Sequence, residues 1–151
     1  MFSENFSVEK ITIVNVIEEF ERHLAQPNRV YPHEIIDSML EHQEYVTPKL
    51  LQKLEQFIAN PPRNANSGEW FEGVVALYVL AKFREQKAFP LVVQLCSFPH
   101  EKIEWLLGDI KTESMPSILA STFNGDYDTL ASLVTNQYLD PYLRWSVLDT
   151  Y

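Results

Sequence analysis

The sequence has one cysteine, Cys96, and only four glycines among its 151 residues. A single cysteine excludes an internal disulfide and indicates a reducing compartment, so we expect the protein to be cytoplasmic. The longest apolar run, from Gly73 to Ala81, is about half the roughly 18 residues that a membrane-spanning helix needs. The first ten residues contain Glu4 and Glu9 and lack the basic and apolar regions of a signal peptide. Secretion without an amino-terminal signal stays open as an alternative.

Basic side chains are also scarce, since 12 Lys and Arg face 21 Asp and Glu, for a formal net charge of −9. The basic residues are scattered singly, whereas a phosphate-binding surface needs them gathered on one face. We therefore expect neither nucleic acid nor an anionic membrane among the partners. Gly-rich phosphate loops, GxSxG elbows and CxxC pairs are absent from the sequence as well.

What the chain does have is hydrophobic periodicity, with 46% hydrophobic and 13% aromatic residues. That content supports one core, so residues 1–151 are predicted to form a single domain. Apolar residues at three- and four-residue steps, with proline near several expected starts, predict an all-α fold of about nine helices. We expect helices at residues 8–24, 32–42, 48–59, 69–84, 88–97, 100–107, 115–123, 127–135 and from 141 onward.

The helix predicted over residues 69–84 carries apolar groups on almost every side, so we expect it to be the central, most enclosed element. Val74, Leu77 and Tyr78 are expected to be buried in it. Residues 60–68 before it have turn chemistry at nearly every position, which predicts the longest loop and a hinge. Further along, Asn124-Gly125 predicts a helix end and Asp126 the cap of the next helix.

Short connections predict antiparallel neighbours, and Trp70, Trp105 and Trp145 recur at intervals of 35 and 40 residues. Both features favour HEAT-like antiparallel helix pairs stacked as a short right-handed α-solenoid, with an irregular helical bundle as the alternative. The last segment, from Pro141, puts apolar groups on more than one face and stops at Tyr151 in mid-pattern. Either the chain is truncated at its carboxyl end or this last helix caps the array.

Two stretches strengthen the repeat interpretation. Asp140-Pro141-Tyr142-Leu143-Arg144-Trp145-Ser146-Val147-Leu148 resembles the first helix of a HEAT-like repeat, in which an Asp before the helix and an Arg four residues later can bond to a neighbouring repeat. The stretch from Tyr78 to Asp109, with Leu80-Ala81-Lys82-Phe83-Arg84-Glu85, Ala88-Phe89-Pro90-Leu91 and Trp105-Leu106-Leu107-Gly108-Asp109, is similar to the bacterial domain-of-unknown-function 1186 family.

This resemblance extends from about Tyr31 to the carboxyl end. It implies a HEAT-like helical fold in a cytoplasmic bacterial protein, and it implies no particular reaction. Some family members end in a cysteine-rich SEC-C zinc motif, which this sequence lacks, so zinc is not carried over.

The candidate chemical groups have simpler structural interpretations. His33, Asp37 and Glu41 fall on one helical stripe and could bind a divalent metal, but a solvated helix face has the same pattern. Cys96 lies among aliphatic residues, which is typical of a small core residue. Asp109 follows Gly108 at a helix end, where it could line a groove or bond nearby amides. We predict no catalytic residue, no cofactor and no metal.

Tryptophan is enriched in cores and at binding hot spots alike. Trp70 is interpreted as a core residue, and Trp105, Asp109, Trp145 and Leu148 as a speculative interaction surface. The leading hypothesis is a protein–protein interaction scaffold that uses a concave helical surface to bind a protein partner. An enzyme or small-ligand binder with carboxylates lining the groove is the first alternative. The second is a structural role, through self-association of the carboxyl-terminal helix.

Overall fold

The computed structural model describes residues 18–22, 33–63 and 67–150, which form helices and connections without a strand. Within these ranges no helix combines the length and the apolar character that a bilayer crossing requires. The predicted all-α class is confirmed. The helices are α2 (His33–Glu41), α3 (Gln43–Ala59), α4 (Gly68–Lys82), the 3₁₀ turn η1 (Gln86–Ala88), α5 (Phe89–Cys96), α6 (His100–Leu107), α7 (Ile110–Glu113), α8 (Met115–Thr122), α9 (Tyr127–Thr135) and α10 (Pro141–Thr150).

Most predicted boundaries agree with these bounds to within a few residues. Of the helix predicted over residues 8–24, residues 18–22 are helical and the rest lie outside the described residues. Asp126 caps α9 as predicted, because its carboxylate accepts the Thr129 amide at 3.1 Å. Gly125 before it has a φ of 94°, which only glycine adopts without strain. Ser67 caps α4 in the same way as Asp126 caps α9.

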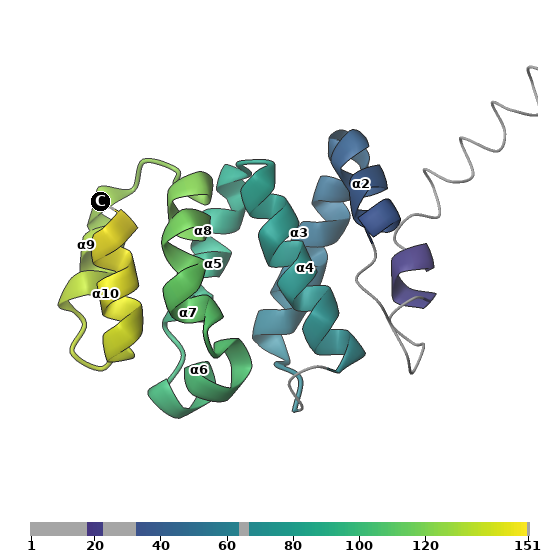
Figure 1. Cartoon of the computed structure of the whole chain (residues 1–151). Helices are drawn as coiled ribbons and strands as arrows, with labels where there is room; N and C mark the ends of the chain where they lie inside the picture. The colour runs from purple at the N-terminus through teal and green to yellow at the C-terminus, as the bar shows by residue number, and fades with distance from the viewer. Residues whose placement is uncertain (1–17, 23–32, 64–66, 151) are drawn as a thin grey trace, which may run out of the picture.

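The helices form two layers (Figure 1). α4, α8 and α10 lie side by side in one layer, where α8 contacts both of its neighbours. α3, α5 and α9 form the layer behind, where α5 contacts both α3 and α9. The layers meet through the contacts of α3 with α4, α5 with α8 and α10 with α9.

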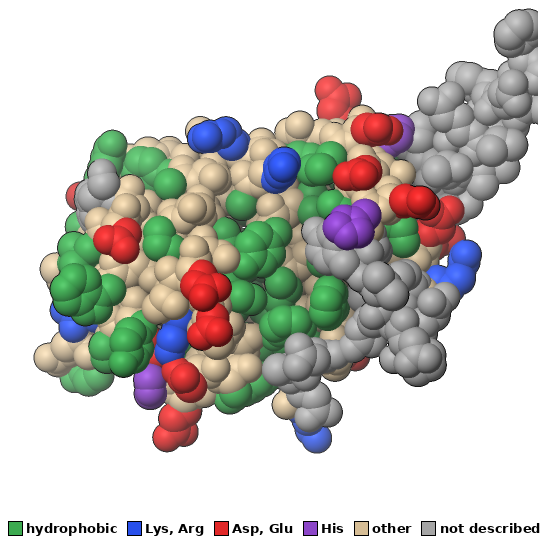
Figure 2. Space-filling view, in the orientation of Figure 1, with side chains coloured by type: hydrophobic (Ala, Val, Ile, Leu, Met, Phe, Trp, Pro, Cys, Tyr) green, Lys and Arg blue, Asp and Glu red, His purple; other side chains and the backbone are tan. Residues whose placement is uncertain are grey.

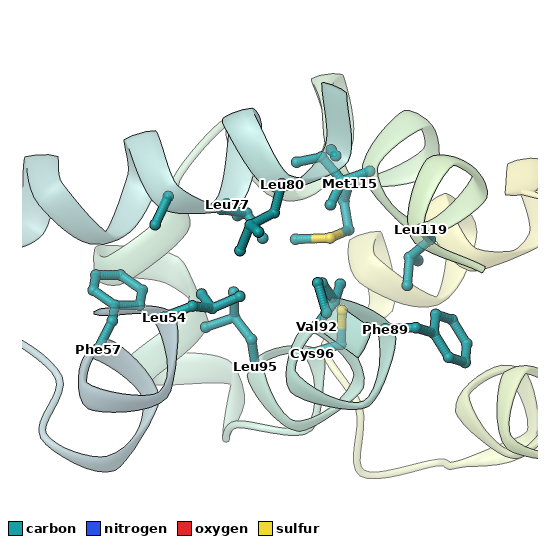
Figure 3. Packing of buried hydrophobic residues seen from close by; sticks show 14 of the residues in the cluster. Leu54, Phe57, Leu77, Leu80, Phe89, Val92, Leu95, Cys96, Met115 and Leu119 are labelled. Carbon is teal, nitrogen blue, oxygen red and sulfur yellow. The ribbon is translucent and has the colours of Figure 1, made fainter. Parts of the chain in front are cut away.

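The hydrophobic core fills the space between the two layers (Figure 3). Leu77 and Leu80 of α4 and Met115 of α8 point toward Leu54 of α3 and Val92 of α5. All five side chains are buried. Truncating a buried leucine such as Leu77 typically costs about 2–5 kcal/mol of folding free energy, so this interlayer packing is the main support of the fold.

Contact between α3 and α4 depends on a glycine. A Cβ atom built on Gly73 would lie 2.0 Å from a ring carbon of Phe57. The ring of Phe57 therefore packs directly on the α4 backbone. The predicted hinge falls in residues 60–68, of which 64–66 lie outside the described residues, and its motion stays a prediction.

Two sequence expectations are wrong. Pro48 does not start α3, which begins at Gln43 and contains Pro48 in its interior. The reason is that the apolar stripe extends upstream to Val46, four residues before Leu50, and both are fully buried. Burial of Val46 outweighs the amide hydrogen bond that an internal proline removes.

Tyr78 is the second error, since it is 40% exposed while Val74 and Leu77 of the same helix are buried as expected. Its phenol reaches across to α8 and donates a hydrogen bond to the Ser114 hydroxyl at 2.5 Å. A buried phenol hydroxyl needs a hydrogen-bond partner inside the core, whereas at the surface the Tyr78 hydroxyl can bond both Ser114 and water. α7 was not predicted at all, because its four residues are too few to show periodicity.

Candidate functional site

The last helix, α10, presents an apolar stripe to solvent. One side of the helix is buried through Leu143, Ser146 and Val147. On the other side Tyr142, Trp145 and Leu148 are 59%, 69% and 48% exposed. The three side chains recur every third residue, so they lie along one face of the helix. We call these three residues the α10 stripe.

Asp140 fixes the start of α10. Its Oδ1 atom accepts the amides of Tyr142 at 2.9 Å and Leu143 at 3.1 Å, which caps the helix. Its Oδ2 atom accepts hydrogen bonds from the His100 ring of α6 and from the Lys111 ammonium group of α7. One fully buried carboxylate thus connects three helices. The resemblance to HEAT-like repeats implies this kind of contact for Asp140.

Lys111 completes the connection between α7 and α10. Its Nζ atom lies 3.2 Å from Asp140, hydrogen-bonds Glu104 of α6, and lies 5.1 Å from the ring centre of Tyr142. The Ser146 hydroxyl donates to the Lys111 carbonyl. We call Asp140, Lys111, His100 and Glu104 the α10 anchor, because they hold one face of the helix while its stripe stays exposed.

The charges of the anchor support one another. Burial by itself raises the pKa of Asp140, but hydrogen bonds from His100, the Leu143 amide and Lys111 hold that pKa below its ordinary value. Burial by itself lowers the pKa of Lys111, and its bonds to Glu104 and Asp140 outweigh this and raise the pKa. Both groups are therefore ionised across the physiological range.

Arg144 holds the opposite side of α10. Its Nε atom donates to the Val134 carbonyl of α9 at 2.9 Å, so Arg144 also bonds to a neighbouring helix as the resemblance implies. α10 also contacts α7, α8 and α9, and these contacts hold the helix in place while its stripe is exposed.

The anchor also brings metal-ligand types together. One potential ligand atom each from His100, Glu104 and Asp140 lies within 4.8 Å of the others. The ammonium group of Lys111 already bonds both carboxylates, so a divalent cation would have to displace a positive charge. The prediction of no metal stays a prediction.

The speculative surface residues lie on three helices or their ends. Trp145 and Leu148 share the α10 stripe, and Trp105 on α6 is 42% exposed. Asp109 is exposed between α6 and α7, and Gly108, with a φ of 52°, ends α6 as the capping interpretation expected. The Asp109 side chain makes no capping bond. Among these helices, α7 contacts both α6 and α10.

Sequence reasoning missed the cluster of His100 and Lys111 around Asp140. No spacing in the sequence relates them, because they come from three helices that meet only in the folded chain. The resemblance of Asp140 and Arg144 to a HEAT-like helix start was the one available signal. Cys96 is buried as interpreted, which raises its pKa to about 12. Trp70 is only partly buried against the core rather than within it, and its indole donates to the Leu106 carbonyl at 2.7 Å.

Two hollows lie on either side of Tyr78, and a third, of about 370 Å³ between α3 and α4, contains Lys53 and Glu72, which pair with each other. The largest, of about 650 Å³, lies between α2 and α4. Its lining is mostly apolar and includes Trp70, and the exposed His33 and Asp37 add polar groups to it. The smallest, of about 290 Å³, lies between α4 and α8 and includes the exposed Glu113. Asp140 is the one buried carboxylate among the described residues, and it lines none of these hollows.

Acidic side chains gather beside the α10 stripe. Figure 2 shows red carboxylate side chains over α6 and α7, next to the green side chains of α10. The two nearby cations, Lys111 and Arg144, are both engaged in the contacts above. The surface around the stripe therefore combines exposed apolar groups with negative charge.

Comparison with known proteins identifies the family of this all-α chain. The model of the family described as "Protein of unknown function (DUF1186)" matches residues 12–151, and the chain belongs to this family. Proteins named "Uncharacterized protein" from Chlamydia trachomatis serovar D and Chlamydia muridarum are each 30% identical over 127 residues, which is 84% of this chain. The match covers 50% and 51% of their lengths, so the chain spans about half of these relatives. No solved structure matches the chain.

Proposed function

We propose that this chain is a cytoplasmic interaction module that binds a partner protein through the α10 stripe. The observation that carries the proposal is Trp145, whose indole is 69% exposed on a helix that the buried Asp140 holds in place. Trp and Tyr side chains on a fixed surface dominate the energy of many interfaces. Because the anchor orders α10 in advance, binding loses little conformational entropy.

The fold supports the scaffold hypothesis. We propose that α3 with α4, α5 with α8, and α9 with α10 are HEAT-like antiparallel pairs, stacked as a short right-handed α-solenoid with a concave surface. Support comes from the two-layer arrangement in Figure 1 and from the bonds of Asp140 and Arg144 to neighbouring helices. Repeat stacks offer long surfaces for protein partners without any catalytic group.

The enzyme alternative has less support. A catalytic carboxylate would be expected in a hollow, with a pKa perturbed by its surroundings. Asp140 is the buried carboxylate that the structure describes, and its two oxygens accept hydrogen bonds from four protein donors. The exposed surface of α10 therefore favours binding over catalysis.

The test is affinity capture from the native organism with the intact chain and two variants. Trp145→Ser combined with Leu148→Ser should reduce capture of the partner by roughly tenfold or more, the loss that one hot spot of about 1.4 kcal/mol causes. The control is Tyr138→Ser, which removes an aromatic residue that is 83% exposed and lies outside the stripe. Circular dichroism should show all three proteins folded. Equal capture by the double variant and the wild type would reject the proposal.

A further inference from the structure

We infer that the partner docks a cationic segment on the α10 stripe, with an apolar anchor flanked by Lys or Arg. This inference rests on the proposed function and adds the chemical class of the partner. We argue it from the charges around the stripe, from the contacts of the nearby cations, and from the repulsion that a second copy of the chain would meet there.

Negative charge dominates this end of the molecule. Residues 100–150 contain eight Asp and Glu side chains but only three Lys and Arg. Asp109 and Glu113 at the two ends of α7 and Asp149 on α10 are exposed. Within the part of the chain that the structure describes, none of these three carboxylates forms an ion pair. They are free to interact with positive charge from outside.

The cations of residues 100–150 are bonded elsewhere and do not pair with these three carboxylates. Lys111 is buried and bonded to Asp140 and Glu104. The guanidinium of Arg144 bonds the Val134 carbonyl, and Lys102 lies over the ring of Phe98 at 4.3 Å. All three cations keep their charge, but against eight carboxylates they leave residues 100–150 with a net charge of −5. Lys82 of α4 lines the same hollow as Glu113, and among the described residues it forms no ion pair with it.

Asp149 adds to this charge. It is exposed on α10, one residue after Leu148 of the stripe, so its carboxylate lies beside the apolar side chains.

A second copy of the chain fits this surface poorly. In a two-fold dimer the same patch meets itself, so the carboxylates beside one α10 stripe would face those beside the other. Each copy also carries a formal charge of −9. A cationic partner gains attraction where a second copy meets repulsion, and rim charges of this kind set the association rate and the choice of partner.

The experiment is site-specific photo-crosslinking with the full chain. Pro141, which is exposed at the start of α10 and is not part of the stripe, is replaced by p-benzoylphenylalanine. All three stripe residues stay in place, and the protein is irradiated in a lysate of the native organism. Mass spectrometry then identifies the crosslinked peptide. We expect a segment with more Lys and Arg than Asp and Glu.

Charge reversal supplies the second measurement. The triple variant Asp109→Lys, Glu113→Lys and Asp149→Lys should lower the crosslink yield by roughly tenfold or more, because it reverses the steering charges. The matched control, Glu34→Lys, Glu44→Lys and Glu55→Lys on α2 and α3, changes the net charge equally and should leave the yield within about twofold of the parent. Equal loss in both variants would overturn the inference, since net charge alone would then explain binding.

The outcomes separate the two proposals. A crosslink to a neutral or acidic segment, or to a second copy of this chain, overturns the cationic partner. A neutral or acidic segment of another protein leaves the interaction module standing. Absence of any crosslink from position 141, in a protein that circular dichroism shows to be folded, rejects the proposed function together with the inference.

Discussion

The carboxylate of Asp140 and the ammonium group of Lys111 lie 3.2 Å apart, with both residues almost completely buried where α7 meets α10. Asp140 serves as the helix cap of α10 at the same time. A buried charge that loses its partner is strongly destabilising, because neither water nor another ion replaces the lost interaction. The position of α10, and of its exposed stripe, therefore depends on this pair.

The first prediction is that Lys111→Ala lowers the free energy of unfolding by about 3–5 kcal/mol, the cost of leaving a buried carboxylate without its cation. Urea melts monitored by circular dichroism measure it. The control is Lys82→Ala on α4, which removes an exposed lysine and should change stability by no more than about 0.5 kcal/mol. Similar melting midpoints for the two variants would show that Lys111 does not hold α10.

The second prediction concerns acid. Because the folded state lowers the pKa of Asp140 below its ordinary value of 3.8, the ionised carboxylate stabilises the fold above that pH. This contribution should be lost as the pH falls from about 3.8 through the lowered pKa. Lys111 acts at the opposite end of the scale, since its raised pKa keeps its contribution until the pH rises past about 10.5.

Urea midpoints measured across the acidic range in the wild type and in Asp140→Asn test this dependence. Asn keeps one capping oxygen but no titrating carboxyl, so the variant should be less stable near neutrality and lose less on acidification. Asp126, whose pKa is lowered by its bonds to Thr129, remains in both proteins and is the internal reference. An acid loss of the same size in both proteins would contradict the assigned role of Asp140.

Local signals in the sequence were enough for much of the fold. The bounds of α6 and α9 follow from Gly108, Asp126 and neighbouring residues, because helix caps act within one turn. Pro48 was misleading, since a local rule placed a helix start where burial of Val46 decides otherwise. Propensity is a weak signal, and tertiary packing overrides it.

The candidate site was predictable only in part. Trp145 and Leu148 stand out because the last helix lacks a fully polar side, and both are exposed. The α10 anchor was not predictable from spacing, because His100 and Lys111 lie 40 and 29 residues from Asp140. Contacts over such separations are set by how helices stack, which single-sequence periodicity does not encode.

The third prediction concerns Gly73, where two opposing effects can be compared. Replacing a helix glycine by alanine ordinarily gains about 1 kcal/mol of helix propensity. At Gly73 the new methyl group would lie 2.0 Å from the Phe57 ring, and overpacking of this kind costs about 1–3 kcal/mol. We therefore expect Gly73→Ala to destabilise the protein in urea melts.

The partner variant identifies the cause of that loss. With Phe57→Leu in the background, the ring is absent and Gly73→Ala should become neutral or stabilising. A double-mutant cycle measures this coupling. If Gly73→Ala is equally destabilising in both backgrounds, the Phe57 ring is not the obstacle.

The last prediction concerns self-association through α10. The α10 stripe attracts apolar surfaces, whereas Asp109, Glu113, Asp149 and the net charge of −9 repel a second copy. At physiological ionic strength charges act over about 8 Å, and at 1 M salt over about 3 Å, while apolar attraction persists. We therefore expect a monomer at physiological salt and a shift toward dimers at high salt, measured by multi-angle light scattering.

Trp145→Ser with Leu148→Ser should remain monomeric at both salt concentrations, and Tyr138→Ser should behave like the wild type. A wild-type dimer at physiological salt that the double variant abolishes would show that the carboxylates do not prevent pairing, and would make a second copy the natural occupant of the stripe.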